Sequence, residues 1–241
     1  MTSLNILSGG AAQGLVGSLA AQFREQTGLD ITGEFGAVGA MADKLRGGTP
    51  ADILVLTSAL IATLARENLV NVASVKDVGR VETALAVREA DPLVSAGDAA
   101  SLRAVFLSAD AIFVPDTKAS TAGIHVAKVL AQLGITEEVE GRLKMYPNGA
   151  TAMRHMAESD ANRPIGCTQA TEIIATKGIK LSGALPKGCD LATTYTAAIT
   201  TKAVHAREAQ VLIDLLTARD SKPLRAQAGF QPFPHPENEV R

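Results

Sequence analysis

Short runs typical of strands alternate with segments of helical period along most of the chain, and this alternation constrains the fold more than any other feature. In residues 12–26, for example, Leu15, Leu19 and Phe23 follow one another at every fourth position and therefore share one helix face. The predicted strands are 4–7, 31–35, 53–56, 83–87, 111–114, 165–168 and 194–200, and the predicted helices are 12–26, 40–46, 58–68, 121–133, 169–177 and 206–217. This order predicts an α/β fold whose mostly parallel sheets carry helices on both faces.

Composition excludes several classes of function. With 241 residues, 46% of them apolar, the chain can bury the core of one large domain or two small ones. Its 23 basic and 25 acidic residues give a net charge of −2, so no basic excess is present to neutralise a nucleic acid. Aromatic residues make up 3% and tryptophan is absent, which disfavours stacking platforms for bases or sugars.

The sequence predicts no metal site, cofactor or disulfide framework, because Cys167 and Cys189 show no metal-ligand spacing and are expected to be free thiols. No apolar run approaches the roughly 20 residues that span a bilayer, so no membrane insertion is expected. Residues 1–7 show neither a basic segment nor the apolar core of a secretion signal. We therefore expect a cytoplasmic protein, or a periplasmic one if a signal has been removed. Residues 232–236 alternate proline with other residues and predict an irregular, mobile tail.

Three turns of small residues each follow a predicted strand and open a helix: residues 8–11, 36–39 and 118–123. In open α/β sheets, ligands bind beyond the carboxyl ends of the strands. A helix N-terminus there presents free N–H groups that attract anions, and glycine lets the ligand approach the backbone closely. The candidate ligand-binding residues in these turns are Ser8, Gly9, Gly10, Ala11, Ala37, Val38, Gly39, Ser120 and Thr121.

Each turn taken alone also fits ordinary helix capping, which uses the same small residues. None carries the Gly-Lys-Ser/Thr of a phosphate loop, and the spacing from Gly36 to Gly39 is too short for a dinucleotide fingerprint. Convergence of all three turns on one point would favour a binding site for a small anion.

Four stretches resemble the bacterial solute-binding proteins of the molybdate-binding type: residues 4–28, 35–42, 48–56 and 122–135. Among them is the Pro50-Ala51-Asp52 strand signature, and their order and spacing fit over about residues 4–232. The resemblance implies a two-lobed, type 2 periplasmic-binding-protein-like fold. Each lobe would be a mostly parallel sheet flanked by helices, with the ligand cleft between the lobes.

The resemblance also implies where the lobes divide. Residues 1–82 together with 198–241 would form the first, discontinuous lobe, and residues 83–197 the second. The chain would cross near residues 83–87 and return near 195–199.

The resemblance gives a specific expectation about the ligand. Molybdate binders of this type carry a serine on each of the first two turns, where this chain has Ala11 and, on the second, Ala37 and Val38. Each lost hydrogen bond to a buried oxyanion costs roughly 1–3 kcal/mol. Residues 79–88 and 120–130 are similar to the aconitate isomerase-like branch of the family. A di- or tricarboxylate is therefore the expected ligand.

Candidate donors in the second lobe are Asn148 and Gly149, on a turn that opens a helix, and Thr168 and Gln169, after a strand where the family carries a tyrosine. Asparagine and glutamine amides donate to carboxylate oxygens, but both residues also suit an ordinary helix start.

Three functions remain open. The first is a solute-binding protein that closes on a small anion, acting as an ABC transporter receptor if it is secreted. The second is an aconitate isomerase-like enzyme that shifts a double bond in a carboxylate, and the third is a molybdate, tungstate or other oxyanion binder. The expected partners are the small anion and, for a secreted protein, a transporter permease. We expect a monomer, because no apolar stripe is left over for an interface.

An isomerase needs a general base, and Lys118 and His125 are the catalytic candidates. Lys118 also fits a solvated loop position, and His125 a partly buried structural one. Arg154, Cys167 and Tyr195 are the other ionisable residues expected near the cleft.

Overall fold

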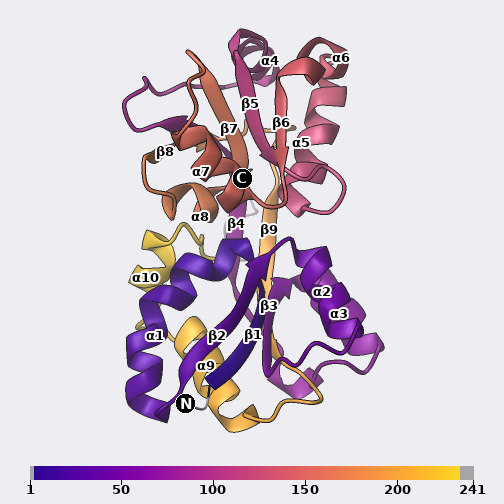
Figure 1. Ribbon diagram of the computed structural model, residues 1–241, viewed down its shortest axis with the longest axis vertical. Coiled ribbons are helices and arrows are strands. Elements are labelled where there is room, and N and C mark those ends of the chain that lie inside the picture. The colour runs from indigo at the N-terminus through magenta and orange to yellow at the C-terminus, as the bar shows by residue number, and fades with distance from the viewer. Residues whose placement is uncertain (1–2, 234–241) are drawn as a thin grey trace, which may run out of the picture.

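Two long strands, β4 (Lys76–Arg88) and β9 (Ala192–Ile199), connect two lobes in the computed structural model, which describes residues 3–233 (Figure 1). The beginning and end of the chain form one lobe, and the middle of the chain forms the other. Residues 76–82 of β4 pair with β9, whereas residues 83–88 pair with strands of the second lobe. A single sheet therefore continues from one lobe into the other through β4, which pairs with β9 on one side and with β7 and β8 further along.

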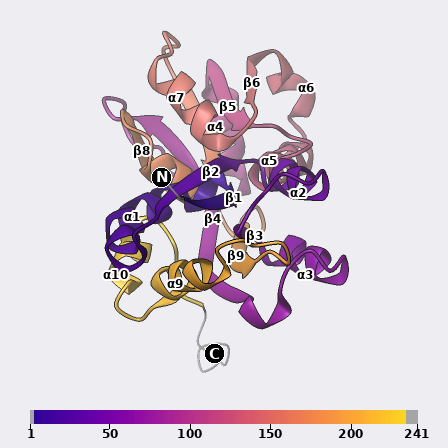
Figure 2. The ribbon, with the colours of Figure 1, turned by 60° about the horizontal axis from the view of Figure 1, so that its bottom comes forward.

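The first lobe is built on the strand order β2-β1-β3-β9. The pairs β1–β2 and β1–β3 are parallel, and β3–β9 is antiparallel. Figures 1 and 2 both place α1 and α10 on one side of this lobe and α2 and α3 on the other. Its elements are β1 (Ser3–Gly9), η1 (Gly10–Ala12), α1 (Gln13–Thr27), β2 (Asp30–Gly36), α2 (Val38–Arg46), β3 (Ile53–Thr57), α3 (Ser58–Arg66), η2 (Val72–Ser74), α9 (Ala206–Thr217) and α10 (Lys222–Gln227).

The second lobe continues the sheet in the order β4-β7-β5-β6, with β8 on the other side of β4. The pairs β5–β6 and β5–β7 are parallel, and β4 is antiparallel to both β7 and β8. Its elements are α4 (Ala99–Ser108), β5 (Ala111–Pro115), α5 (Thr121–Gln132), α6 (Thr136–Val139), η3 (Glu140–Arg142), β6 (Leu143–Tyr146), α7 (Gly149–Ala157), β7 (Pro164–Gln169), α8 (Ala170–Ile174) and β8 (Ile179–Ala184).

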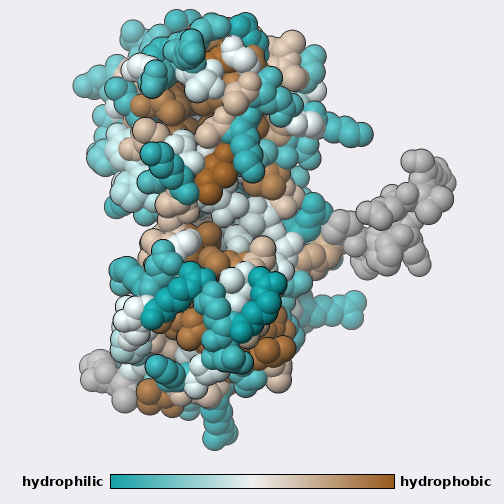
Figure 3. Space-filling model, turned by 90° about the vertical axis from the view of Figure 1, so that its right-hand side faces the viewer, coloured by the Kyte–Doolittle hydropathy of each residue, from teal (hydrophilic) through white to brown (hydrophobic). Residues whose placement is uncertain are grey.

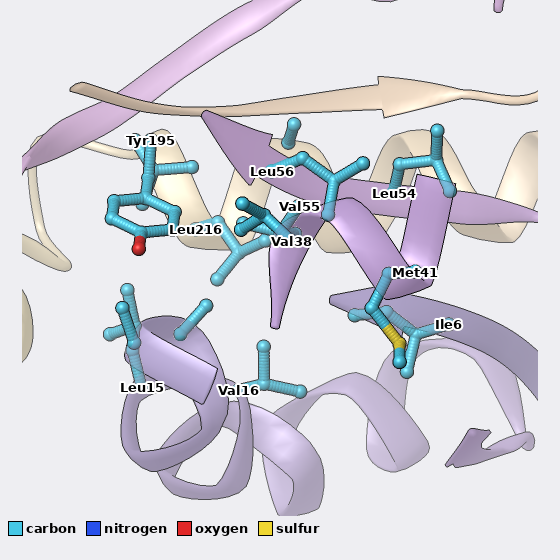
Figure 4. Close-up of a cluster of buried hydrophobic side chains, with 14 of the residues drawn as sticks. Ile6, Leu15, Val16, Val38, Met41, Leu54, Val55, Leu56, Tyr195 and Leu216 are labelled. Carbon is cyan, nitrogen blue, oxygen red and sulfur yellow. The ribbon is translucent and has the colours of Figure 1, made fainter. Parts of the chain in front are cut away.

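Side chains alternate between two hydrophobic cores along the strands of the second lobe. In β4, Ala84 and Ala86 join a large core that continues through the first lobe, whereas Leu85 and Val87 join a second core on the opposite face. Successive strand residues point to opposite faces, so a fully apolar strand is buried on both. Figure 4 shows the first-lobe part of the large core, where residues of α1, α2, β3 and β9 meet.

Asp52 of the Pro-Ala-Asp signature ties the two ends of the first lobe together. Its buried carboxylate accepts hydrogen bonds from the backbone N–H of Asn5 at 2.8 Å, of Val204 at 2.7 Å and of His205 at 2.9 Å. These bonds fix the segment leading from β9 into α9 against β1. The signature is therefore structural in this chain.

The alternation of strands and helices and the two-lobed fold are confirmed. Several elements were not predicted: α4, α6, α10, β6 and β8. The helix expected over 169–177 is five residues long, and the one expected over 58–68 runs from Ser58 to Arg66. Gly28 ends α1 with φ 74°, as expected of a C-terminal glycine. Residues 234–236 of the predicted tail lie outside the described residues, and the lobe limits 82/83 and 197/198 stay a prediction. Tyr195 falls within the predicted second lobe, but it pairs with Thr57 of β3 and is therefore grouped with the first lobe below.

Within residues 3–233, no helix combines the length and apolar character needed to cross a membrane. Cys167 and Cys189 are both buried free thiols.

Candidate functional site

A small, partly enclosed cavity lies between the lobes, where the predicted turns converge. Its free volume is about 10 Å³, room for about one water molecule. The first lobe lines it with Gly10, Gly36, Ala37, Val38 and Tyr195, and the second with Ser120, Thr121, Ala122, Asn148, Gln169 and Glu172. An anion of several atoms therefore enters only when the lobes part or a lining side chain turns away.

Three helices of at least nine residues begin at this cavity: α2 after Ala37, α5 after Ser120 and α7 after Asn148. The first N–H groups of a helix lack partners within it and carry partial positive charge. The Asn148 side chain accepts a hydrogen bond from the Thr151 N–H at 2.8 Å, so its carbonyl oxygen caps α7. Neither Ala37 nor Ser120 makes a side-chain cap.

Gln169, at the end of β7, has a buried amide without a partner. The residue is 3% exposed, and neither its Nε2 nor its Oε1 has a hydrogen-bond partner in the structure. An unsatisfied buried polar group costs roughly 1–3 kcal/mol, and nearly all such groups in native proteins are paired. This amide lines the cavity, so it offers a donor and an acceptor to a ligand there.

Glu172 places a carboxylate at the same cavity, and it is 6% exposed. Thr168 Oγ1 donates a hydrogen bond to Glu172 Oε2 at 2.6 Å, and the backbone N–H groups of Gly149, Ala150 and Gln169 lie close enough to favour the charged form of the carboxylate. Burial raises the pKa of Glu172, and these donors oppose part of the rise. The start of α7 therefore already holds a carboxylate.

Two glycines allow the Glu172 carboxylate to sit there. A methyl group at Gly149 would overlap both the carboxylate and the Thr168 hydroxyl, and one at Gly10 would overlap the carboxylate from the other lobe. Close approach, and not an unusual backbone angle, is the reason for glycine at both positions.

Tyr195 of β9 is the one titratable residue that the first lobe brings to the cavity among the described residues. It is 3% exposed, and its ring meets that of Phe230 edge to face, with centroids 6.3 Å apart. Burial, together with the negative charge of Glu172, raises the pKa of Tyr195, so the phenol stays neutral.

An open groove flanks the cavity on either side. One, of about 690 Å³, includes Asn148, Arg154 and Lys177. The other, of about 610 Å³, includes Val38 and Thr121, which also line the cavity. This second groove lies between α2, α3 and α5, where the two lobes meet, on the side that faces the viewer in Figure 3. Both grooves share residues with the cavity and give it paths to solvent.

The structure brings seven of the predicted residues together at the cavity: Gly10, Ala37, Val38, Ser120, Thr121, Asn148 and Gln169. Their contact with a ligand stays a prediction. Gly149 and Thr168 support it indirectly, through Glu172.

Other predicted residues lie elsewhere. The Ser8 hydroxyl is fully buried and donates to the carbonyls of Gly9 and Val55, so it links β1 to β3 and points away from the cavity lining. Gly9 packs against Tyr195 and Val38, and Ala11 is buried in the large core.

The two expected catalytic residues do not line the cavity either. Lys118 and Gly39 lie in the 610 Å³ groove. His125 Nε2 lies 2.8 Å from the carbonyl oxygen of Cys189 and is engaged in holding the loop before β9. Arg154 lies in the 690 Å³ groove, and Cys167 is buried in the second core, where desolvation raises its pKa to about 12.

Sequence reasoning missed Glu172. Its one local signal is an acidic residue inside an apolar stretch, Ala170-Thr171-Glu172-Ile173-Ile174, where three of its four neighbours are buried. On a short amphipathic helix the same pattern fits a solvent-facing residue, so the signal alone does not identify a site.

Fold and cavity together define a two-lobed binding protein with its ligand site between the lobes. A family model described as bacterial extracellular solute-binding protein matches residues 4–231, so the chain belongs to this family. No group of three or more His, Cys, Asp or Glu residues able to hold a metal ion occurs in the part of the chain that the structure describes.

Three similar proteins illustrate the range of the family. An aconitate isomerase from Pseudomonas sp is 23% identical over 245 residues, covering 97% of this chain and 89% of the relative. The molybdate-binding protein ModA of Escherichia coli K12 is 22% identical over 196 residues, covering 75% and 70%. The solved periplasmic molybdate-binding protein of Azotobacter vinelandii superposes with a TM-score of 0.77 at 18% identity, covering 97% of this chain and all of that one. This last likeness shows the fold.

Proposed function

We propose that this solute-binding protein closes its lobes on a small di- or tricarboxylate in the cavity between them. One observation carries the proposal: the cavity already contains a carboxylate, that of Glu172, which accepts a hydrogen bond from Thr168 and lies against Gly149 at the start of α7. The N-termini of α2 and α5 and the unpaired Gln169 amide remain as donors for a second anion. These groups offer N–H donors but no full positive charge, and such a set suits a small organic anion.

A ligand screen tests this proposal. Citrate, cis-aconitate, trans-aconitate, molybdate, tungstate and sulfate are compared by thermal shift, and each hit is measured by calorimetry. We expect the tricarboxylates to raise the melting temperature, because ligand binding to the folded state alone stabilises it. Stabilisation by molybdate, tungstate or sulfate alone would show that the ligand is an inorganic oxyanion instead.

Glu172 also favours a second candidate, an isomerase similar to the aconitate isomerase of Pseudomonas sp. Shifting a double bond requires a base that takes a proton from carbon and an acid that returns one. A buried carboxylate with a raised pKa suits both steps. Proton NMR of cis- and trans-aconitate with the protein in D₂O would show deuterium entering the substrate. Tight binding without deuterium exchange would rule out the isomerase and leave ligand binding as the function.

The two roles differ in the compartment that they require. A receptor that delivers its ligand to an ABC transporter permease works outside the cytoplasmic membrane, whereas an isomerase also works in the cytoplasm. In fractionation of cells that produce the protein from its full gene, recovery in the cytoplasm alone would rule out the receptor, whereas recovery outside the cytoplasmic membrane would fit both roles.

A further inference from the structure

The cavity contains a carboxylate but no cation among the residues of the described chain that line it. Glu172 lies between the two lobes, with its oxygens against Gly149 of one and Gly10 of the other. Any anion bound in the cavity would therefore come to lie beside a second carboxyl group.

The charged groups on neighbouring elements do not compensate for that charge. Tyr195, the titratable group that faces Glu172 from β9, stays neutral. The remaining charged or titratable side chains on the elements packed against α8 do not line the cavity. Most have other partners or lie in the open groove: Arg24 with Asp30, Lys76 with Asp214, Asp77 with Thr196, Arg88 with Asp91, Lys180 with the Glu89 carbonyl, His155 stacked on Tyr146, buried Cys167, and Arg154, Glu158 and Lys177 in the groove. Glu25 is exposed on α1, and Arg80 and Glu82 lie on the part of β4 that pairs with β9.

Two negative charges in contact at this cavity repel strongly, because Glu172 is buried and little water screens them. Carboxyl groups that share such a site keep one proton between them. Since no cation is at hand, a proton is the positive charge available to this cavity.

We propose that Glu172 determines the ligand specificity of the cavity by binding the anion as a neutral carboxylic acid, so that one proton enters with each ligand. This inference rests on the proposed function, because it takes the cavity as the anion site. As an acid, Glu172 adds an O–H donor for a ligand oxygen. As a carboxylate, it rejects the same ligand by repulsion. The residue thereby makes binding depend on pH.

The test compares wild-type protein with Glu172→Gln, whose amide is neutral at every pH. Glu137→Gln serves as the control, since Glu137 is an exposed residue of α6 and its replacement removes the same charge far from the cavity. Affinities for trans-aconitate and molybdate are measured between pH 6 and pH 9, where carboxylate probes do not titrate. Wild type and the control should lose affinity by up to about tenfold per pH unit once ligand-free Glu172 ionises. Glu172→Gln should show no such loss.

Calorimetry of the wild type in buffers of different ionisation enthalpy counts the protons without relying on a variant. We expect uptake that approaches one proton per ligand as pH rises. A flat wild-type profile with no proton uptake, or equal slopes in wild type and Glu172→Gln, would overturn the inference while leaving anion binding intact. If neither probe binds to wild type, the proposed function fails, and the inference fails with it.

Stability without ligand gives an independent measurement. The pKa of Glu172 is higher in the folded protein than in the unfolded chain, so its stabilising contribution is complete below the unfolded value and is lost as pH rises through the folded value. The melting temperature of Glu172→Gln should therefore rise relative to that of wild type as pH increases from 5 to 9. A pH-independent difference would contradict the proposed acid form.

Discussion

The two lobes contribute unlike halves of the cavity. The first lobe supplies glycine, alanine and valine at the starts of η1 and α2, with the phenol of Tyr195 as its polar side chain. The second supplies two hydroxyls, two amides and the carboxyl group of Glu172. The first lobe thus gives shape and backbone N–H groups, whereas the second gives most of the side-chain chemistry. A site divided in this way is complete only when the lobes close.

The largest expected effect comes from Gly149→Ala in the second lobe. The added methyl group would overlap Glu172 and Thr168 together, so either the carboxylate leaves or α7 shifts. We expect a loss of about 1–3 kcal/mol in the free energy of unfolding and at least about tenfold weaker anion binding. Chemical denaturation and calorimetry measure the two quantities.

Gly10→Ala is the matched change in the first lobe, and its methyl group meets only the end of the flexible Glu172 side chain. It should therefore cost less stability. Gly17→Ala in α1 has open space around the new methyl group and should leave stability unchanged or slightly raised. If Gly10→Ala and Gly149→Ala lower the free energy of unfolding by the same amount, the contrast between the lobes does not hold.

Gln169→Leu comes next and should separate stability from binding. It removes two unpaired buried atoms, so the ligand-free protein should melt higher, by an amount equivalent to up to about 2 kcal/mol. The same change removes hydrogen bonds to a charged ligand and should weaken binding roughly tenfold to a hundredfold. Lower stability together with unchanged affinity would show that the amide serves the fold and not a ligand.

The smallest effect is expected for Tyr195→Phe, which removes the hydroxyl of the first lobe but keeps the ring against Phe230. Loss of one neutral hydrogen bond corresponds to about 0.5–1.5 kcal/mol, or roughly twofold to tenfold in affinity. Calorimetry of Tyr195→Phe and Gln169→Leu under the same conditions measures the difference in their affinities for the anion. An effect larger than that of Gln169→Leu would reverse the assignment of chemistry to the second lobe.

Much of the fold could be predicted because its signals are local. The helix face of Leu15, Leu19 and Phe23 and the apolar run of β3 each depend on neighbours within a few residues, and all of these side chains are buried. The start of α5 after Ser120 was predicted for the same reason, whereas α2 begins at Val38, two residues before the predicted start. β8 and β6 escaped prediction, because β6 carries exposed side chains and β8 is broken by Gly183, so neither shows a clear apolar period.

The sequence by itself determined the alternation of strands and helices, the turns that meet at the cavity and the absence of an overall basic excess. Tertiary structure alone decided the direction of each polar side chain. It turned the Ser8 hydroxyl toward the Val55 carbonyl and brought Glu172 to Gly149 and Gly10, which lie 23 and 162 positions away in the chain. The physical reason is that helix starts follow local rules, whereas the surroundings of a buried charge depend on segments that only folding brings together.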